Sequence, residues 1–388
     1  MSLSPPLVVT GWPRMSAPAR AVLMSLVTGG PSSRSELAAE HGVSRSSLTR
    51  IARELVDNGL VVEGVTELRA PTGRPSELLR VKPDARHFVG IKLTADVLYA
   101  AVVDLGGTVI AAAEQALGSR IPAEVAAQIV GTTRSLQVET PTIAGVGVTL
   151  AGSVVTVGSE QMVIDSEFLQ WRDLDLSSVL SSIDGLPVTW GNDVQALAAT
   201  EHWFGPGAHL DSLVLITVGA GVGCGIIANG ALVLGATGSP GRLAHLPIDR
   251  SGPICRSGHR GCANVYLTND AIARSISQAL GSPVNYAEAV ELAQARNPAA
   301  LRGFDDAGAA LGQAVGLVSN LLDPQKIVVT GDGLALWEIS PAAIRHGIEL
   351  SAERAPELLK VEAVPFEFEE WARAAGVLAL QAAVDIAR

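Results

Sequence analysis

Asn192 and Asp193 are adjacent polar residues in the stretch PVTWGNDVQALAATEHWFG, which runs from Pro187 to Gly205. The pattern predicts a short apolar strand ending at Trp190 and an amphipathic helix from about Val194. In open α/β folds ligands bind outside the carboxyl ends of the strands, and a carboxylate there can take a proton from a substrate hydroxyl. Asn and Asp are also preferred helix N-caps, so these residues alone leave capping and catalysis both open.

A glycine-rich turn, TVGAGVGCG, extends from Thr217 to Gly225. Glycines let backbone amides approach a phosphate closely, but they serve tight strand turns equally well, so the turn is weak support for a nucleotide site. The corresponding turn earlier in the chain, IKLTADVL, has Lys92 and Leu93 where a small acidic loop would be needed to hold Mg²⁺ and phosphate. The first half of any nucleotide clamp is therefore missing.

Residues with soft metal-ligating atoms follow in the stretch RLAHLPIDRSGPICRSGHRGC. His245, Cys255 and Cys262 suit zinc, with Ser257 or His259 near a fourth position, and closed zinc sites normally have four N or S ligands. Serine is a poor ligand, however, and two buried cysteines beside a hydrogen-bonded histidine explain the same pattern. Both interpretations stay open.

Two similar α/β segments contain these candidates. Three apolar runs from His87 (FVGIKL, VLYAAVV and TVIAAAE) recur from Ser212 as LVLITV, GCGII and ALVLG. Helices that alternate with strands follow each set. The repeat predicts two lobes, each starting with a three-stranded meander, and a cleft between them.

Residues 1–83 predict a winged helix-turn-helix. Helical spacing covers residues 17–28, Ser33 and Glu36 match a capping box that opens a second helix, and an amphipathic third helix follows Ser44. GLVVEG and TGRPSELLRV then predict two strands of a hairpin. The alternative is a three-helix packing module with a solvated polar face.

The start of the third helix is the candidate DNA-binding surface. Its polar and cationic residues would face the major groove and its phosphates, and they are Ser44, Arg45, Ser46, Ser47, Thr49 and Arg50. Arg74, between Gly and Pro in TGRP, is held extended and suits a narrow minor groove. A solvent-exposed hairpin tip is the alternative for Arg74.

Length and composition limit the class of protein. A chain of 388 residues exceeds one ordinary core, and 48% hydrophobic with 17% charged residues argues against disorder. We expect a cytoplasmic protein, because no run approaches the ~18 apolar residues of a membrane span and the N-terminus lacks a signal pattern. Up to Arg86 there are 11 Lys and Arg against 8 Asp and Glu, and thereafter 17 against 31. Only the N-terminal region therefore suits a polyanion.

The chain resembles the ROK family (repressor, open reading frame, kinase) over nearly its whole length, in the branch of transcriptional regulators with an N-terminal winged helix. The motifs are the TGRP wing, WGNDVQALAATEHWFG, ITVGAGVGCGIIANG, PGRLAHLPI, CRSGHRGC and LLDPQKIVVTGDG in this order. The resemblance implies an α/β body of two ribonuclease-H-like lobes of the sugar kinase/hexokinase/actin type. These are residues 84–195, completed by a C-terminal helix at about 371–388, and residues 196–370. It also implies a sugar site in the cleft, and dimers or dimers of dimers.

The resemblance assigns roles by position. Asp193 matches the catalytic base of the family's kinases, Asn192 its sugar-contacting neighbour, and His245 a residue that binds zinc and touches the sugar. Lys92 falls in the loop where those kinases have Asp-x-Gly-Gly-Thr, which should disable Mg²⁺–ATP binding. We therefore expect no catalytic residues and no bound ATP.

Three further departures concern the ligand and the metal. Arg242 and Asn264 replace two sugar-binding carboxylates, and Ser257 replaces a zinc thiolate. Arg242 would suit an anionic group, such as that of a sugar phosphate or acidic sugar, unless it turns outward or pairs with an acidic neighbour. Zinc is then bound weakly through a substituted ligand, or not at all.

Together these features predict a DNA-binding repressor of carbohydrate uptake or catabolism genes. A symmetric dimer would bind a pseudo-palindromic DNA operator, and a sugar or sugar derivative between the lobes would shift its operator affinity. One alternative is an active ATP-dependent sugar kinase with an attached DNA-binding head. Another is a regulator that responds to a protein partner. No membrane partner is expected.

Overall fold

The computed structural model describes residues 12–67, 76–140, 142–157 and 160–385. The chain forms two compact units. Unit 1 comprises the residues up to His209 together with those from Glu369 onward, and unit 2 comprises Leu210–Phe368. None of the helices among the described residues is long and apolar enough to cross a membrane.

The N-terminal part of unit 1 is a winged helix-turn-helix. Its elements are α1 (Ala17–Gly29), β1 (Ser32–Ser33), α2 (Arg34–Glu40), α3 (Arg45–Asp57), β2 (Val61–Glu67) and β3 (Ser76–Val81). The three predicted helices and the capping box are confirmed, because Ser33 Oγ accepts the Glu36 amide while the Glu36 carboxylate accepts the Ser33 amide. The predicted wing residue Arg74 lies outside the described residues.

A six-stranded sheet in the order β11-β12-β7-β4-β5-β6 forms the centre of the rest of unit 1. Strands β4, β5 and β6 make the predicted antiparallel meander, and β7 and β12 extend it in parallel. The strands are β4 (His87–Leu93), β5 (Val97–Asp104), β6 (Val109–Ala116), β7 (Ile143–Leu150), β11 (Ser182–Ile183) and β12 (Leu186–Asn192). A smaller sheet contains β8 (Ser153–Val157), β9 (Glu160–Ser166) and β10 (Trp171–Asp175).

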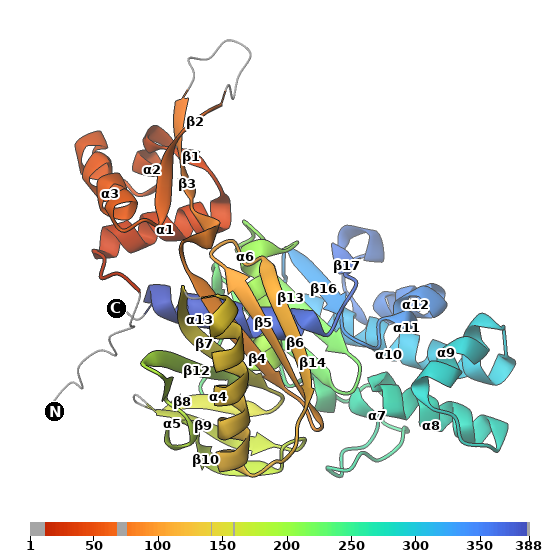
Figure 1. Ribbon diagram of the computed structural model, residues 1–388. Helices are drawn as coiled ribbons and strands as arrows, with labels where there is room; N and C mark the ends of the chain where they lie inside the picture. The colour runs from red at the N-terminus through yellow and green to blue at the C-terminus, as the bar shows by residue number, and fades with distance from the viewer. Residues whose placement is uncertain (1–11, 68–75, 141, 158–159, 386–388) are drawn as a thin grey trace. The chain divides into compact units, whose positions relative to one another are not determined.

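Helices cover both faces of the six-stranded sheet (Figure 1). Helix α4 (Pro122–Glu139) shares a core with alternate residues of β4, whereas α13 (Glu369–Asp385) and α6 (Asp193–Phe204) pack on the other side. Glycines in the strands permit this approach, because a Cβ at Gly90 would lie 1.9 Å from Ala372 O and one at Gly147 would lie 1.8 Å from Ala375 O. Short elements are α5 (Leu176–Val179) and η1 (Pro83–Ala85).

The winged helix shares a hydrophobic core with α6 and α13. Leu23 of α1 and Leu55 of α3 belong to the same buried cluster as Phe88 of β4 and Leu380 of α13. Phe204, the last residue of α6, packs against that cluster. The winged helix is therefore packed onto the carboxyl ends of two helices of its own unit.

Unit 2 is built on a five-stranded sheet in the order β15-β14-β13-β16-β17. Its strands are β13 (Leu213–Val218), β14 (Val222–Ala228), β15 (Ala231–Leu232), β16 (Lys326–Thr330) and β17 (Val361–Ala363). Its helices are α7 (Asn264–Leu267), α8 (Asn269–Leu280), α9 (Tyr286–Gln294), α10 (Pro298–Leu322), α11 (Ala335–Ile339) and α12 (Pro341–Ser351), with the short turns η2 (Leu243–His245) and η3 (Pro356–Leu358). The long helix α10 packs its apolar face against the sheet. The third strand of the predicted meander is only two residues long.

Candidate functional site

Asp193 begins α6, and its carboxylate forms an ion pair with the ammonium group of Lys92 on β4. Both residues are buried, with exposed fractions of 5% and 4%. The Lys92 ammonium also lies 4.9 Å from the ring centroid of Trp371 on α13, a cation–π arrangement. The carboxylate that would act as a base is thus neutralised by a cation of its own chain.

Asn192 is the N-cap of α6, and its side chain is fully engaged by its own unit. Its Oδ1 accepts a hydrogen bond from the Gln195 amide at 2.9 Å, and its Nδ2 donates to Gly152 O at 2.8 Å. The capping interpretation is therefore confirmed for Asn192. A role in sugar contact stays a prediction.

Four side chains with N or S donor atoms converge in unit 2. Cys255 Sγ lies 3.8 Å from His245 Nδ1 and 3.6 Å from His259 Nδ1, and Cys262 Sγ lies 3.9 Å from His245 Nδ1. A tetrahedral zinc ion holds its N and S ligands roughly 3.5 Å apart, given zinc–ligand distances near 2.0–2.3 Å. The donor atoms of His245, Cys255 and His259 lie within 4.8 Å of one another. These three donors fit a metal ion, and Cys262 lies beside them through its contact with His245.

The two thiols of this cluster differ in their ionisation. Burial opposes ionisation of Cys255, but hydrogen bonds from the backbone of His259 and Ser257 outweigh it and lower the pKa of that thiol. Burial, together with the neighbouring Cys255, raises the pKa of Cys262. Ser257 is exposed and hydrogen-bonds to Cys255.

The other ligand candidates of unit 2 flank this cluster along the chain. Arg242 is exposed and directly precedes η2, which contains His245. Asn264 is half-buried and begins α7, two residues after Cys262. The predicted ligand residues therefore divide between Asn192 and Asp193 in unit 1 and these in unit 2.

The N-cap and first two turns of α3 contain the candidate DNA-binding residues. Ser44 is the N-cap and accepts the Ser47 amide at 3.2 Å, so its hydroxyl serves the helix. Arg45, Thr49 and Arg50 are exposed, as is Ser46, whereas the buried side of the helix consists of Leu48, Ile51, Ala52 and Leu55. The polar face is therefore available to a ligand.

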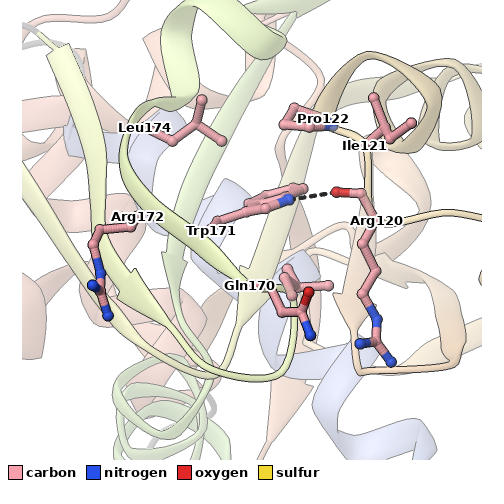
Figure 2. Close-up of a pocket in the computed structure, with 8 residues that line it drawn as sticks. Arg120, Ile121, Pro122, Gln170, Trp171, Arg172 and Leu174 are labelled. Carbon is pink, nitrogen blue, oxygen red and sulfur yellow. Dashed lines mark hydrogen bonds between the residues drawn. The ribbon is translucent and has the colours of Figure 1, made fainter.

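One hollow in unit 1, of about 430 Å³, contains none of the residues predicted from the sequence. Figure 2 shows Trp171 at its centre, with the indole Nε1 donating to Arg120 O at 2.7 Å. The flanking arginines, Arg120 and Arg172, are ion-paired with Asp96 and Asp165. The indole and both arginines thus bind their own chain, and we assign the hollow no ligand.

Comparisons with known proteins place the chain in a family. The sequence profile of the ROK family matches residues 88–383.

The chain belongs to the ROK family.

Its relatives include repressors that match it along most of their length. The chain is 25% identical to the xylose repressor of Bacillus subtilis over 312 residues, which cover 79% of this chain and 80% of the relative. It is 25% identical to the DNA-binding transcriptional dual regulator NagC of Escherichia coli over 339 residues, covering 84% and 83%. Both alignments therefore extend over about four-fifths of each chain.

Solved structures of ROK proteins have the same fold. A ROK transcriptional regulator described as a homologue of the E. coli MLC protein superposes with a TM-score of 0.81 at 25% identity, covering 95% of this chain and 97% of that one. A ROK glucokinase from Streptomyces griseus, solved with glucose and AMPPNP, gives 0.63 at 23% identity and covers 76% of this chain and 99% of that one. The similarity to the kinase shows a shared fold and no more. The regulator structure covers a larger part of this chain than the kinase structure does.

Proposed function

We propose that this ROK protein is a DNA-binding transcriptional regulator that represses carbohydrate uptake or catabolism genes and responds to a sugar or sugar derivative. The observation that carries the proposal is the winged helix-turn-helix, whose helix α3 exposes Arg45 and Arg50 within its first two turns. Cationic side chains at the start of a recognition helix contact phosphates and base edges in the major groove. The similarity to repressors along most of the chain supports the same function.

The body of the protein is a sensor and not a kinase in this proposal. Sugar phosphorylation needs a free carboxylate to accept the hydroxyl proton and a metal ion to hold the phosphates. Lys92 pairs with Asp193 at this position, so its charge opposes a metal ion and holds the carboxylate. The active sugar kinase remains the second candidate, because Asp193 and the glycine-rich turn are both present.

Helix α6 gives the sensor a physical connection to the DNA-binding head. It begins at Asp193, ends at Phe204 in the core shared with the head, and spans about 18 Å at 1.5 Å per residue. Helix α13 makes a second connection, from Trp371 beside Lys92 to Leu380 in the same core. A ligand that binds one arrangement of these helices better than the other changes operator affinity.

We further propose that zinc is held by His245, Cys255, Cys262 and His259. In this arrangement His259 takes the position left by Ser257, so that the set keeps four N or S ligands. Zinc there is structural and fixes the loop that carries Arg242 and Asn264 toward the sugar. Ser257 then serves as a hydrogen-bond partner of Cys255.

The assembly in this proposal is a symmetric dimer or dimer of dimers in the cytoplasm. Two heads related by a two-fold axis fit a pseudo-palindromic operator, with half-sites about one helical turn apart. The effector is a neutral sugar, or an anionic sugar derivative if Arg242 contacts it.

Capture of genomic DNA tests the proposal. The full-length protein is immobilised, fragments of the source genome are applied, and bound fragments are eluted with single sugars and then sequenced. The proposal expects enrichment of fragments next to carbohydrate uptake or catabolism genes, and elution by a sugar. Retention without sequence preference, or ATP-dependent phosphorylation of a sugar, would contradict it.

A further inference from the structure

The glycine-rich turn of unit 2 lies against a second turn of the same chain. Residues 219–221 connect β13 to β14, and residues 331–333 follow β16, the parallel neighbour of β13. The Gly333 amide donates to Val218 O at 2.9 Å, and the Asn269 amide donates to Gly219 O at 2.9 Å. Both carbonyl groups at the carboxyl end of β13 are thus hydrogen-bonded within unit 2.

The carboxylate of Asp332 occupies the space beside the glycine-rich turn. It accepts a hydrogen bond from the backbone amide of Ala220 and another from Asn269 Nδ2 at 2.8 Å. A Cβ at Gly219 would lie 1.9 Å from Asp332 Oδ1. A side chain at 219 would therefore have to displace the Asp332 carboxylate, and glycine leaves room for it.

We propose that Asp332 is a specificity-determining residue that occupies the anion position of the glycine-rich turn and excludes nucleotide phosphates from it. The backbone amides of such turns bind phosphate oxygens, and here Asp332 already takes the amide of Ala220. An incoming phosphate would also meet a like charge at contact distance, which disfavours binding strongly where water is partly excluded. Rejection of the wrong ligand by a built-in like charge is a common device of specific sites.

A purely structural tie does not require a charged group at this position. Burial raises the pKa of Asp332, against hydrogen bonds from Ala220 and Asn269 that lower it. The residue is also exposed to solvent. Its carboxylate therefore both bonds the turn and faces the solvent from which a phosphate would approach.

The inference rests on the proposed function, in which the body responds to a sugar without ATP. In unit 1, Lys92 pairs with the carboxylate of Asp193. In unit 2, Asp332 occupies the glycine-rich turn at residues 219–221. The two residues therefore remove kinase chemistry independently, and each has its own test.

Titration calorimetry of the full-length protein with ADP and with adenosine tests the role of Asp332. Adenosine lacks phosphate, so it separates the glycine-rich turn from any contact to the base. The variants are Asp332→Asn, which keeps size and removes charge, and Asp332→Gly, which empties the position. Asp270→Asn is the matched control, because Asp270 is an exposed acid adjacent in sequence to Asn269.

We expect the wild type and Asp270→Asn to bind ADP no tighter than adenosine. Asp332→Asn or Asp332→Gly should bind ADP at least about tenfold tighter than the wild type, a difference of ~1.4 kcal/mol, with adenosine unchanged. The inference would be overturned if the wild type and both Asp332 variants bound ADP with the same affinity, or if none of them bound it. Using two variants guards against one that fails to fold.

Operator binding by the same proteins separates the two proposals. Gain of ADP binding in a chain that binds no operator would support the exclusion by Asp332 and count against the proposed function. Operator binding with no gain of ADP binding would do the reverse.

Discussion

The ammonium group of Lys92 and the carboxylate of Asp193 form a buried ion pair at the point where helix α6 begins. The pair joins strand β4 to α6, and Trp371 brings α13 to the same ammonium group. Both helices end in the core that contains the winged helix. A pair of charges at the sensor end is therefore connected by packed helices to the DNA-binding end.

Replacing Lys92 by methionine should destabilise unit 1 by about 3–5 kcal/mol, because Asp193 would remain buried without its partner. Urea denaturation followed by tryptophan fluorescence measures this, since five of the six tryptophans belong to unit 1.

The control is the double variant Lys92→Met and Asp193→Asn, which removes both charges. It should lose much less than the sum of the two single variants, because the uncompensated charge is absent. Additive losses would show that the two side chains do not interact.

Arg45→Ala and Arg50→Ala should each weaken operator binding by about 1–3 kcal/mol, because the N-terminal residues of a recognition helix contact base edges and phosphates. Fluorescence anisotropy at several salt concentrations measures the affinity. A loss that is uniform across DNA sequences, with a shallower salt dependence, identifies a phosphate contact.

The matched control for these variants is Arg274→Ala with Arg302→Ala, two exposed arginines of unit 2. It changes the net charge as much as a double variant that carries both Arg45→Ala and Arg50→Ala. If the control lost as much operator affinity as the α3 variants, the effect would come from the overall charge and not from contacts of α3.

The purified protein should contain one zinc ion per chain, and His259→Ala should lower that content after dialysis, because three ligands hold zinc less firmly than four. Metal analysis gives the ratio, and cobalt substitution reports the number of thiolates from its absorption spectrum. Ser257→Cys in the His259→Ala background should restore retention. Unchanged zinc content in His259→Ala would exclude His259 as a ligand.

Stability should fall as the pH decreases from about 7.5 to 5.5, in part through His87. Burial lowers the pKa of His87 more than the negative charges of Asp104 and Asp84 raise it. Its Nδ1 lies 2.6 Å from Thr142 Oγ1. The unfolded chain takes up the proton first, with a pKa near 6.5, so stability present above that pH is lost below it. The free energy of unfolding of His87→Gln should vary less over this range, and an identical pH dependence would contradict the assignment.

Local patterns predicted local structure well. The capping box of Ser33 with Glu36 and the N-cap at Ser44 depend on residues three positions apart, and both are present. The cap at Asn192 follows from its place before an amphipathic helix. The apolar pattern predicts an end of β12 at Trp190, two residues too early, because Gly191 and Asn192 are small or polar but still pair with β7.

The sequence did not predict the contacts that determine the chemistry. Lys92 and Asp193 are 101 positions apart, and Asp332 reaches a turn more than a hundred positions earlier. Their meeting depends on which strands become neighbours, and β13 pairs with β16 across two intervening strands and several helices. An acid between two glycines in TGDG was the available signal for Asp332. His259 was considered beside Ser257, and the folded loop brings its ring to Cys255.

The most direct test of the central claim is the operator affinity of the full-length protein with and without a sugar that raises its melting temperature. Fluorescence anisotropy on the captured operator should give at least about a fivefold change in affinity with the sugar alone. Mg²⁺–ATP should neither be required nor be consumed. An operator affinity that no stabilising sugar changes, or a change that appears only while ATP is converted to ADP, would contradict a sugar-sensing regulator.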